Sequence, residues 1–344
     1  MKVQRETLSH GKRLGRAREI LLFGPVYFFL SLIALRDKLL LTPAWFDGTL
    51  VTNHNLLLQF HYTNNEQSRL LQFLIPELFH RLFSLGIEDA YVLQRWLFIF
   101  LALVCFHVYL GKWFSAAVSF AGVLFLASIL PLANQNDLQE SAPLLLLTFL
   151  AGLWAIRDNN VPAMIATFFF GSLNNETMLV LPLIYLLYDY KSSKIADLII
   201  LFRNTILVSL PLVLPIGIIR FINRDRPALV PLWQLPDNVS GVLHQLLHLD
   251  ILHLYSADFL YVFFIFGAFW VYAFIRYKKL PPFLRRAALV VPLFVGVHLV
   301  VGFIPEVRLM LPLSGIIIPM ALCFLFPSER YQDSPELAGS VGGL

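Results

Sequence analysis

Two asparagines, a glutamate and a threonine interrupt a long apolar stretch in the segment GSLNNETMLVLPL. A single straight helix over 161–188 would bury Asn174, Asn175 and Glu176 in the middle of a membrane. The apolar limbs on either side have about half the length of a membrane-crossing helix, which needs roughly 20 residues. We therefore predict two half-length helices that enter and leave on the same side, joined by a polar turn that floors an outward-facing wet pocket.

The residue types of this turn suit binding of an anion. Gly171 and Ser172 can end the first helix, and Asn174 or Asn175 can cap the second. The N-terminus of the second helix then directs its positive end at the pocket. Glu176 has two interpretations that the sequence leaves open: a functional carboxylate in the pocket, or an ion pair with an arginine that holds the bundle together.

Two residues of the first long loop are further candidates. Asp47, in TPAWFDGTL, has the chemistry of a general base for an acceptor hydroxyl, although on spacing alone a surface-loop aspartate is the simpler interpretation. Arg69 opens an amphipathic segment, where its guanidinium could hold a lipid phosphate through two parallel hydrogen bonds or meet bulk headgroups.

Three short polar segments elsewhere contain the remaining candidates for substrate binding. LANQNDLQES groups amides and acids suited to a hydroxyl-rich ligand, RFINRDRP places three arginines at a membrane edge, and FIPEVRLMLP places an acid and a base between two spans. The last two charges could instead form a buried ion pair. The candidate residues are Asn136, Asp137, Glu140, Arg220, Arg224, Arg226, Glu306 and Arg308.

Metal or nucleotide chemistry has little support in the sequence. His244 and His248 have the i, i+4 spacing of metal ligands, but His253 falls off that face, and interfacial side chains are the simpler interpretation. The chain has no phosphate-binding loop motif, dinucleotide fingerprint or CxxC pair. We expect no metal, no cofactor and no nucleic-acid partner.

The elements that must position these residues are membrane-spanning helices. Of the 344 residues 58% are hydrophobic and only 14% are charged, where a soluble domain has about a quarter charged. This composition predicts an all-α polytopic transmembrane bundle with about eight full spans and one broken pair. The predicted spans are 20–35, 91–110, 114–133, 141–156, 198–221, 259–275, 287–303 and 311–326.

Basic residues indicate the orientation of the bundle. The N-terminal KVQRETLSHGKRLGRAREI and the loop at 276–286 are strongly basic, which predicts that both are cytoplasmic. Alternating spans then place the two long loops, about 36–90 and 222–258, on the outer face. We expect one transmembrane domain over 1–330 and a short disordered cytoplasmic tail over 331–344. The predicted location is a bacterial plasma membrane, with both termini in the cytoplasm.

Both long loops contain amphipathic segments. Residues 69–86, interrupted by Pro76, and residues 240–259 alternate apolar and polar side chains at helical spacing. Such segments lie in the headgroup plane. They either line an entrance for a lipid or wall off the bundle.

The order of these features resembles the GT-C class of membrane glycosyltransferases. Asp47 in AWFDGTL matches the acidic residue of their first outer loop, NNETMLVLP is similar to the Lys/Asn-Glu-Thr turn of many bacterial members, and PEVRLMLPL is similar to their late Glu-x-Arg segment. The resemblance implies a polyprenyl-phosphate-linked sugar donor and a sugar or glycan acceptor on the outer face. No adjacent acidic pair accompanies Asp47, so the resemblance does not extend to a metal-dependent mechanism.

The sequence therefore favours a glycosyltransferase of the cell envelope. Asp47 would deprotonate the acceptor, and Arg220, Arg224 or Arg308 would hold the leaving phosphate together with the helix end at Asn175 and Glu176. Three alternatives remain open: an outer-face polysaccharide polymerase or ligase, a transporter or lipid flippase, and a non-catalytic membrane partner on the same scaffold.

Overall fold

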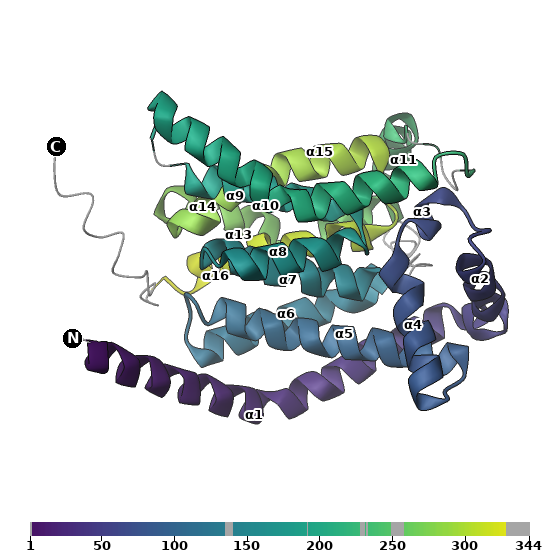
Figure 1. Ribbon diagram of the computed structural model, residues 1–344, viewed down its shortest axis with the longest axis horizontal. Helices are drawn as coiled ribbons and strands as arrows, with labels where there is room; N and C mark the ends of the chain where they lie inside the picture. The colour runs from purple at the N-terminus through teal and green to yellow at the C-terminus, as the bar shows by residue number, and fades with distance from the viewer. Residues whose placement is uncertain are drawn as a thin grey trace.

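The protein is an all-helical bundle of membrane-spanning segments (Figure 1). The computed structural model describes residues 2–327 except 135–139, 191, 228–230, 232 and 249–257, and it describes side chains from residue 17 onward, 44 and 45 apart. Within these residues there is no strand. Seven helical segments are long and apolar enough to cross a membrane, so the predicted fold class is confirmed. They are Ala17–Leu41, Ile87–Leu110, Ala116–Asn134, Ile195–Ile222, Asp258–Ile275, Pro282–Val301 and Val307–Leu325.

These segments follow the predicted spans with boundaries shifted by a few residues. The predicted span 141–156 is a 16-residue helix, which rises about 24 Å and is shorter than the other seven. The long helices are α1 (Lys2–Leu41), α5 (Ile87–Leu110), α6 (Ala116–Asn134), α7 (Ala142–Arg157) and α10 (Ile195–Ile222). The last three spans are each divided into shorter helices: α12 (Tyr261–Phe264) and α13 (Phe269–Ile275), α14 (Pro282–Ala287) and α15 (Val291–Val301), and the 3-10 helix η7 (Val307–Leu313) followed by α16 (Ser314–Leu325).

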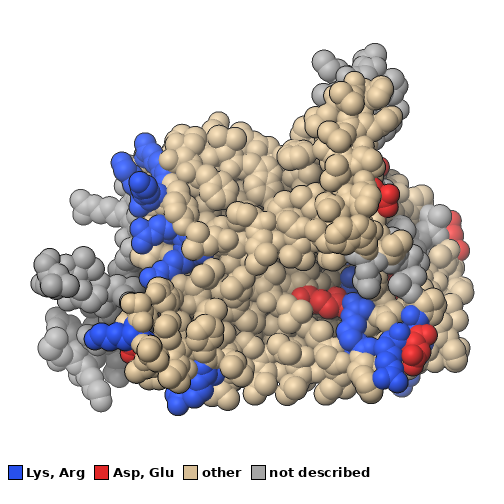
Figure 2. Space-filling view, turned by 90° about the horizontal axis from the view of Figure 1, so that it is seen from above, with Lys and Arg blue, Asp and Glu red and all other residues tan. Residues whose placement is uncertain are grey.

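The two ends of the bundle differ in structure. At one end, here called the terminal end, α1 begins and α16 finishes (Figure 1). At the opposite end, here called the loop end, lie α2 (Thr49–Leu58), α3 (Asn64–Gln67), α4 (Leu70–Phe83) and α11 (Leu235–Leu247). On the face in Figure 2, basic side chains form one group at the terminal end and another towards the loop end, where most of the acidic side chains also lie. Both predicted long loops therefore lie at the same end of the bundle.

The interfacial segments are helical with two corrections to the prediction. Pro76 does not interrupt the first one, because α4 continues through it and buries the proline ring. The second one begins earlier than predicted, at Leu235, and ends at Leu247. Residues 249–257, which include His253, and the predicted tail over 331–344 lie outside the described residues.

The predicted broken pair is a re-entrant hairpin. α8 (Val161–Ser172) runs antiparallel to α7, so that Asn174 lies beside Ser141 at the beginning of α7. The 3-10 helix η2 (Glu176–Leu179) and α9 (Val180–Asp189) then return, and the Tyr188 hydroxyl donates to the carbonyl of Arg157 at the end of α7. The hairpin thus begins and ends at the terminal end, with its turn towards the loop end, as the half length of its limbs predicted.

Arg286 on α14 fixes the base of this hairpin. Its Nη1 donates to the carbonyl oxygens of Leu187, Tyr188 and Tyr190 at 3.2, 2.6 and 2.5 Å. These are carbonyls of the last turn of α9, which has no further helical donors for them. The guanidinium also places positive charge at the negative end of the helix, so it stabilises the returning limb.

The core lies around α7 and the last span. The apolar stretch of the segment Val307–Leu325 is 89% buried inside the bundle, whereas the apolar stretches of α1 and α10 are each 22% buried. α8 packs between α7 and α10 and so separates this core from the outermost helix. The exposed Ile, Leu and Phe side chains of α1 and α10 are those expected of helices that face lipid.

Candidate functional site

The candidate site is the turn of the re-entrant hairpin, residues 173–176, here called the tip. α8 ends at Ser172, and the Asn175 side chain caps η2 by accepting from the backbone N–H of Thr177 at 2.9 Å. The predicted termination and cap are both confirmed. A Cβ atom at Gly171 would lie 2.3 Å from Cε of Met178, so glycine permits the two limbs to meet closely.

Asn174 anchors the tip to the bundle. Its side chain is fully buried, and its Nδ2 donates to the carbonyl of Ser141 at 3.1 Å. That bond holds the tip against the beginning of α7. Asn174 therefore fixes the position of the tip relative to α7.

Glu176 and Arg220 form an ion pair at the tip. Arg220 lies in the last turn of α10 and reaches Glu176 with Nη2, while Nη1 donates to the side-chain oxygens of Asn64 and Asn65. The Glu176 side chain is 28% exposed and that of Arg220 is 34% exposed. Glu176 thus has an arginine partner, as one of its two interpretations predicted, and both partners remain partly exposed.

The layer formed by α3 and α4 covers another side of the tip. The backbone N–H of Leu71 donates to the carbonyl of Leu173 at 3.1 Å. Arg69 is mostly buried and faces Glu66 at 3.4 Å, and Glu66 also accepts from Gln72 at 2.5 Å. The structure thus brings Arg69 to the tip region, but its described ionic partner is a carboxylate of its own layer.

Glu140, one residue before Ser141, belongs to a buried charge cluster near the tip. Arg95 donates to Glu140 at 2.7 Å and to Asn134 at 3.1 Å, and Nζ of Lys38 lies 4.0 Å from Glu140. The Arg95 and Glu140 side chains are 1% and 2% exposed. Asn136 and Asp137, predicted with Glu140, lie outside the described residues.

Sequence reasoning missed Lys38 and Arg95. Arg95 lies four residues into the predicted span 91–110, and a charge at that position is a signal of function or of a buried partner. Lys38 follows the first predicted span and lies within α1, because that helix continues to Leu41. Both cations were therefore visible in the sequence, but their shared partner was not.

Four other candidates lie at the loop end without a described contact to the tip. Arg224 lies over the ring of Phe221 and 3.5 Å from Asp225. Arg226 donates to Asn223 at 2.8 Å. The described contacts of both arginines are thus with residues of the same turn. Glu306 and Arg308 form an ion pair at 2.6 Å, as the second interpretation of that segment predicted.

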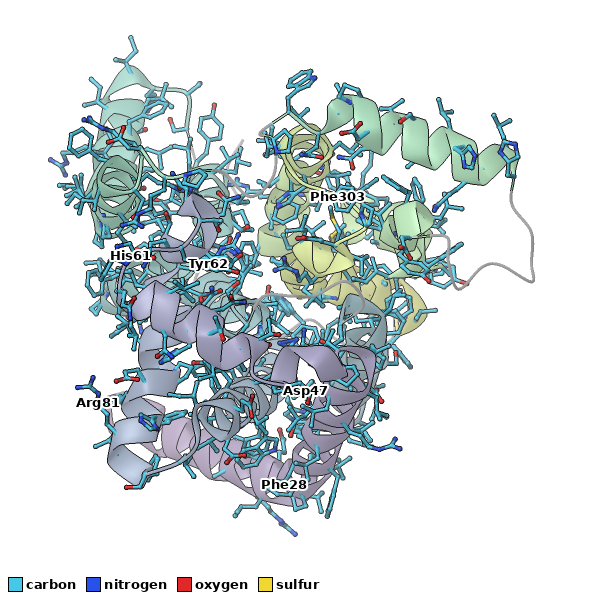
Figure 3. The ribbon with its side chains drawn as sticks, turned by 90° about the vertical axis from the view of Figure 1, so that its right-hand side faces the viewer. Phe28, Asp47, His61, Tyr62, Arg81 and Phe303 are labelled. Atoms are coloured by element: carbon cyan, nitrogen blue, oxygen red, sulfur yellow. The ribbon has the colours of Figure 1, made fainter. Side chains whose placement is uncertain are left out.

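Asp47 is exposed on the turn that precedes α2 (Figure 3). The next residue, Gly48, has a φ of +84° and donates its backbone N–H to Glu88 at 3.1 Å, at the beginning of α5. This bond holds the turn against the bundle. Asp47 is thus an accessible carboxylate at the same end of the molecule as the tip.

A buried histidine joins the covering layer to α5. His54 on α2 hydrogen-bonds the Tyr91 hydroxyl through Nδ1 and Glu77 through Nε2, each at 3.1 Å. Burial lowers the pKa of His54, more than the neighbouring Glu77 raises it. Glu77 loses solvation by burial, but its hydrogen bonds from His54 and Arg81 lower the pKa of this carboxyl overall. The three side chains lock α2, α4 and α5 together.

Comparisons with protein-family models, with curated proteins and with solved structures find no match for this chain.

The chemistry of the tip suits binding of an anion. Arg220 presents a planar guanidinium whose donors suit a phosphate, and the capped beginning of η2 and α9 adds the positive end of a helix. Glu176 occupies that position as the resident anion. An anionic ligand would have to share Arg220 with Glu176 or displace it. No group of three metal-ligating side chains occurs among the described residues.

Proposed function

We propose that the protein is a membrane glycosyltransferase that moves a sugar from a polyprenyl-phosphate donor to an acceptor at the loop end. The supporting observation is the accessible Glu176–Arg220 pair on the tip of a re-entrant hairpin. Irregular backbone at membrane depth is tolerated where it is buried in protein or lines a cavity, and an ionisable residue there is a functional candidate. The loop end corresponds to the outer face of a bacterial plasma membrane, because the basic loops lie at the terminal end.

The proposed chemistry transfers one glycosyl group. Asp47 accepts the proton of the acceptor hydroxyl, whose oxygen forms a bond to the anomeric carbon of the donor. The bond between that carbon and the phosphate oxygen breaks, and the electron pair leaves with the polyprenyl phosphate. Arg220 stabilises the negative charge that develops on the leaving phosphate, at the expense of its bond to Glu176.

Binding of the leaving lipid provides a test that does not require the sugar to be known. Full-length protein in a neutral detergent is titrated with undecaprenyl phosphate, and with undecaprenol as the uncharged control, and bound lipid is counted by native mass spectrometry. We expect preference for the phosphate. Arg220→Gln should remove most of that preference, because the cation is lost, whereas Arg224→Gln, one turn away and paired with Asp225, should retain it.

The reaction is tested through its common product. Protein in lipid nanodiscs receives a panel of undecaprenyl-phosphate-linked hexoses and pentoses together with a membrane-glycan acceptor fraction, and released undecaprenyl phosphate is measured by mass spectrometry. Wild type should release it from at least one donor, and Asp47→Asn should abolish release while leaving lipid binding intact. Phosphate binding with no release from any donor would contradict the enzyme and favour a flippase or a non-catalytic partner.

A further inference from the structure

The beginning of α3 is joined to the end of α10. The backbone N–H of Asn64 donates to the carbonyl of Pro227 at 3.0 Å, and its side-chain Nδ2 donates to the carbonyl of Asn223 at 2.7 Å. Asn223 directly follows α10. Ser68 in turn donates its hydroxyl to the carbonyl of Asn64 at 2.7 Å. Asn64 thus links the layer of α3 and α4 to a helix end 159 residues away (Figure 3, where Tyr62 marks the chain just before α3).

Two neutral oxygens hold one nitrogen of the Arg220 guanidinium. Nη1 donates to Oδ1 of Asn64 and, at 3.2 Å, to Oδ1 of Asn65. The two contacts of Asn64 fix the orientation of its amide, because its donor faces the Asn223 carbonyl and its acceptor faces a guanidinium that has only donors. Turning the amide over would place like groups against each other on both sides. Nη1 carries two N–H groups, so the two asparagines occupy it fully.

The other edge of this guanidinium has a different environment. Nη2 donates to Glu176, and Nε has no hydrogen-bond partner among the described residues. The Arg220 side chain is 34% exposed, and this Nε is not one of the buried polar atoms. Nε and Nη2 form the edge from which two N–H groups point in parallel, a geometry that suits a phosphate. An anion that displaces Glu176 can therefore bind Nε and Nη2 together while Nη1 stays with the asparagines.

The holding oxygens leave the charge of Arg220 available. A carboxylate partner compensates the charge of an arginine, whereas a neutral amide oxygen fixes its position without compensating it. Arg95 shows the first case, because Glu140 accepts from it at 2.7 Å inside the bundle. Arg220 has both kinds of partner, and only Glu176 competes with an anionic ligand.

We propose that Asn64 and Asn65 are positioning residues that hold Nη1 of Arg220, so that Nε and Nη2 bind the lipid phosphate through two hydrogen bonds. This inference rests on the proposed function and adds the residues that orient its cation. When the phosphate displaces Glu176, the guanidinium remains at the tip because its other edge stays bound. Asn64 is itself fixed to the Asn223 carbonyl, so the arginine is oriented before the lipid arrives. A group oriented in advance loses less conformational freedom on binding.

The two-bond geometry is tested by keeping the charge and removing the planar donor pair. Full-length protein in a neutral detergent is titrated with undecaprenyl phosphate or with undecaprenol, and bound lipid is counted by native mass spectrometry. Arg220→Lys should weaken phosphate binding about tenfold and leave undecaprenol binding unchanged, because an ammonium has no planar pair of donors. Wild-type phosphate affinity in Arg220→Lys would overturn the two-bond geometry.

The positioning role is tested at Asn65, whose one described side-chain contact is with Arg220. Asn65→Ala should weaken phosphate binding about threefold, because one hydrogen bond to the cation is lost, and should leave undecaprenol binding unchanged. The same substitution should have no further effect in the Arg220→Gln background. Asn55→Ala removes an exposed amide from α2 in the same region and should change neither lipid.

Two further variants separate orientation from charge. Asn64→Ala removes the anchor on α10 as well as the contact with Arg220, so it should weaken phosphate binding more than Asn65→Ala does, by about tenfold. Asn65→Asp keeps an oxygen acceptor for Arg220 but adds a charge that competes with the phosphate. It should weaken phosphate binding without lowering resistance to SDS unfolding, a result that a merely structural contact would not give.

A measurement without lipid separates this inference from the proposed function. The SDS fraction at half unfolding is compared for wild type, Asn65→Ala, Arg220→Gln and the double variant. We expect the double variant to match Arg220→Gln, and additive shifts would overturn the contact. Phosphate preference that survives every asparagine substitution would overturn the positioning role alone. Absence of phosphate preference in wild type would overturn the proposed function and the phosphate role of this pair, whatever the SDS titration shows.

Discussion

Two of the arginine–glutamate pairs near the tip have opposite character. Arg95 and Glu140 are 1% and 2% exposed and lie within the bundle near the tip, whereas Arg220 and Glu176 are 34% and 28% exposed and join the end of α10 to the tip. A fully buried pair has lost its hydration and depends on each partner being present. A partly exposed pair contributes little to folding, but its charges remain accessible to a ligand. The difference assigns the first pair to the scaffold and the second to the site.

The largest expected effect is the loss of the buried pair. Arg95→Met leaves Glu140 in a buried environment with Lys38, 4.0 Å away, as its remaining described cation. We expect the free energy of unfolding to fall by roughly 3–5 kcal/mol, because an uncompensated buried charge is that costly. Unfolding in a mixed-micelle SDS titration measures it. Arg224→Met, at an exposed pair, should change it by less than about 0.5 kcal/mol. A loss below about 1 kcal/mol for Arg95→Met would remove the scaffold role.

The tip itself should be sensitive to one added methyl group. Gly171→Ala places a Cβ against Met178, whose Cε would lie 2.3 Å away. We expect a destabilisation of about 1–3 kcal/mol from overpacking. Nothing lies within 4 Å of a Cβ at Gly217 on α10, so Gly217→Ala should be neutral or stabilise by up to about 1 kcal/mol. The measurement is the same SDS titration. Equal effects of the two substitutions would show that the limbs do not meet at Gly171.

The exposed pair should separate stability from binding. Arg220→Gln removes a partner of Glu176, but water reaches both side chains. We expect a stability loss of no more than about 1 kcal/mol, together with the loss of preference for undecaprenyl phosphate. Thermal unfolding and native mass spectrometry on one preparation give both values. A loss as large as that of Arg95→Met, with lipid preference intact, would reverse the assignment of the two pairs.

The smallest expected effect is a pH dependence of the layer that covers the tip. Burial lowers the pKa of His54 below its ordinary value of 6.5, and hydrogen bonds lower that of Glu77. Both groups bind protons more readily in the unfolded chain. Stability from His54 is therefore complete above about pH 6.5 and falls as the pH decreases below it, and Glu77 adds a loss at more acidic pH. Hydrogen exchange of α2 between pH 7.5 and 5.5 measures this. His54→Gln should flatten the profile, and an unchanged slope would contradict the assignment.

How much of the site the sequence predicts depends on the range of the interactions. The hairpin follows from local facts: two apolar limbs of half length, Gly171 at the end of one, and an asparagine cap before the other. The cap at Asn175 is an interaction over two residues and could be predicted from spacing. The partner of Glu176 could not, because Arg220 is 44 residues away and no spacing singles out one arginine of the chain. Arg95 and Glu140 are 45 residues apart, and no spacing links them.

The sequence by itself determined the solvent and the lengths of this protein's helices. A chain with 58% hydrophobic and 14% charged residues has to place its spans in lipid, and the membrane thickness then decides which segments cross it and which turn back. Only the tertiary structure decided which charged side chains form ion pairs with one another. Burial of a charge depends on what packs over it. At the tip this is set by elements distant in sequence: the beginning of α7, α4 and the end of α10.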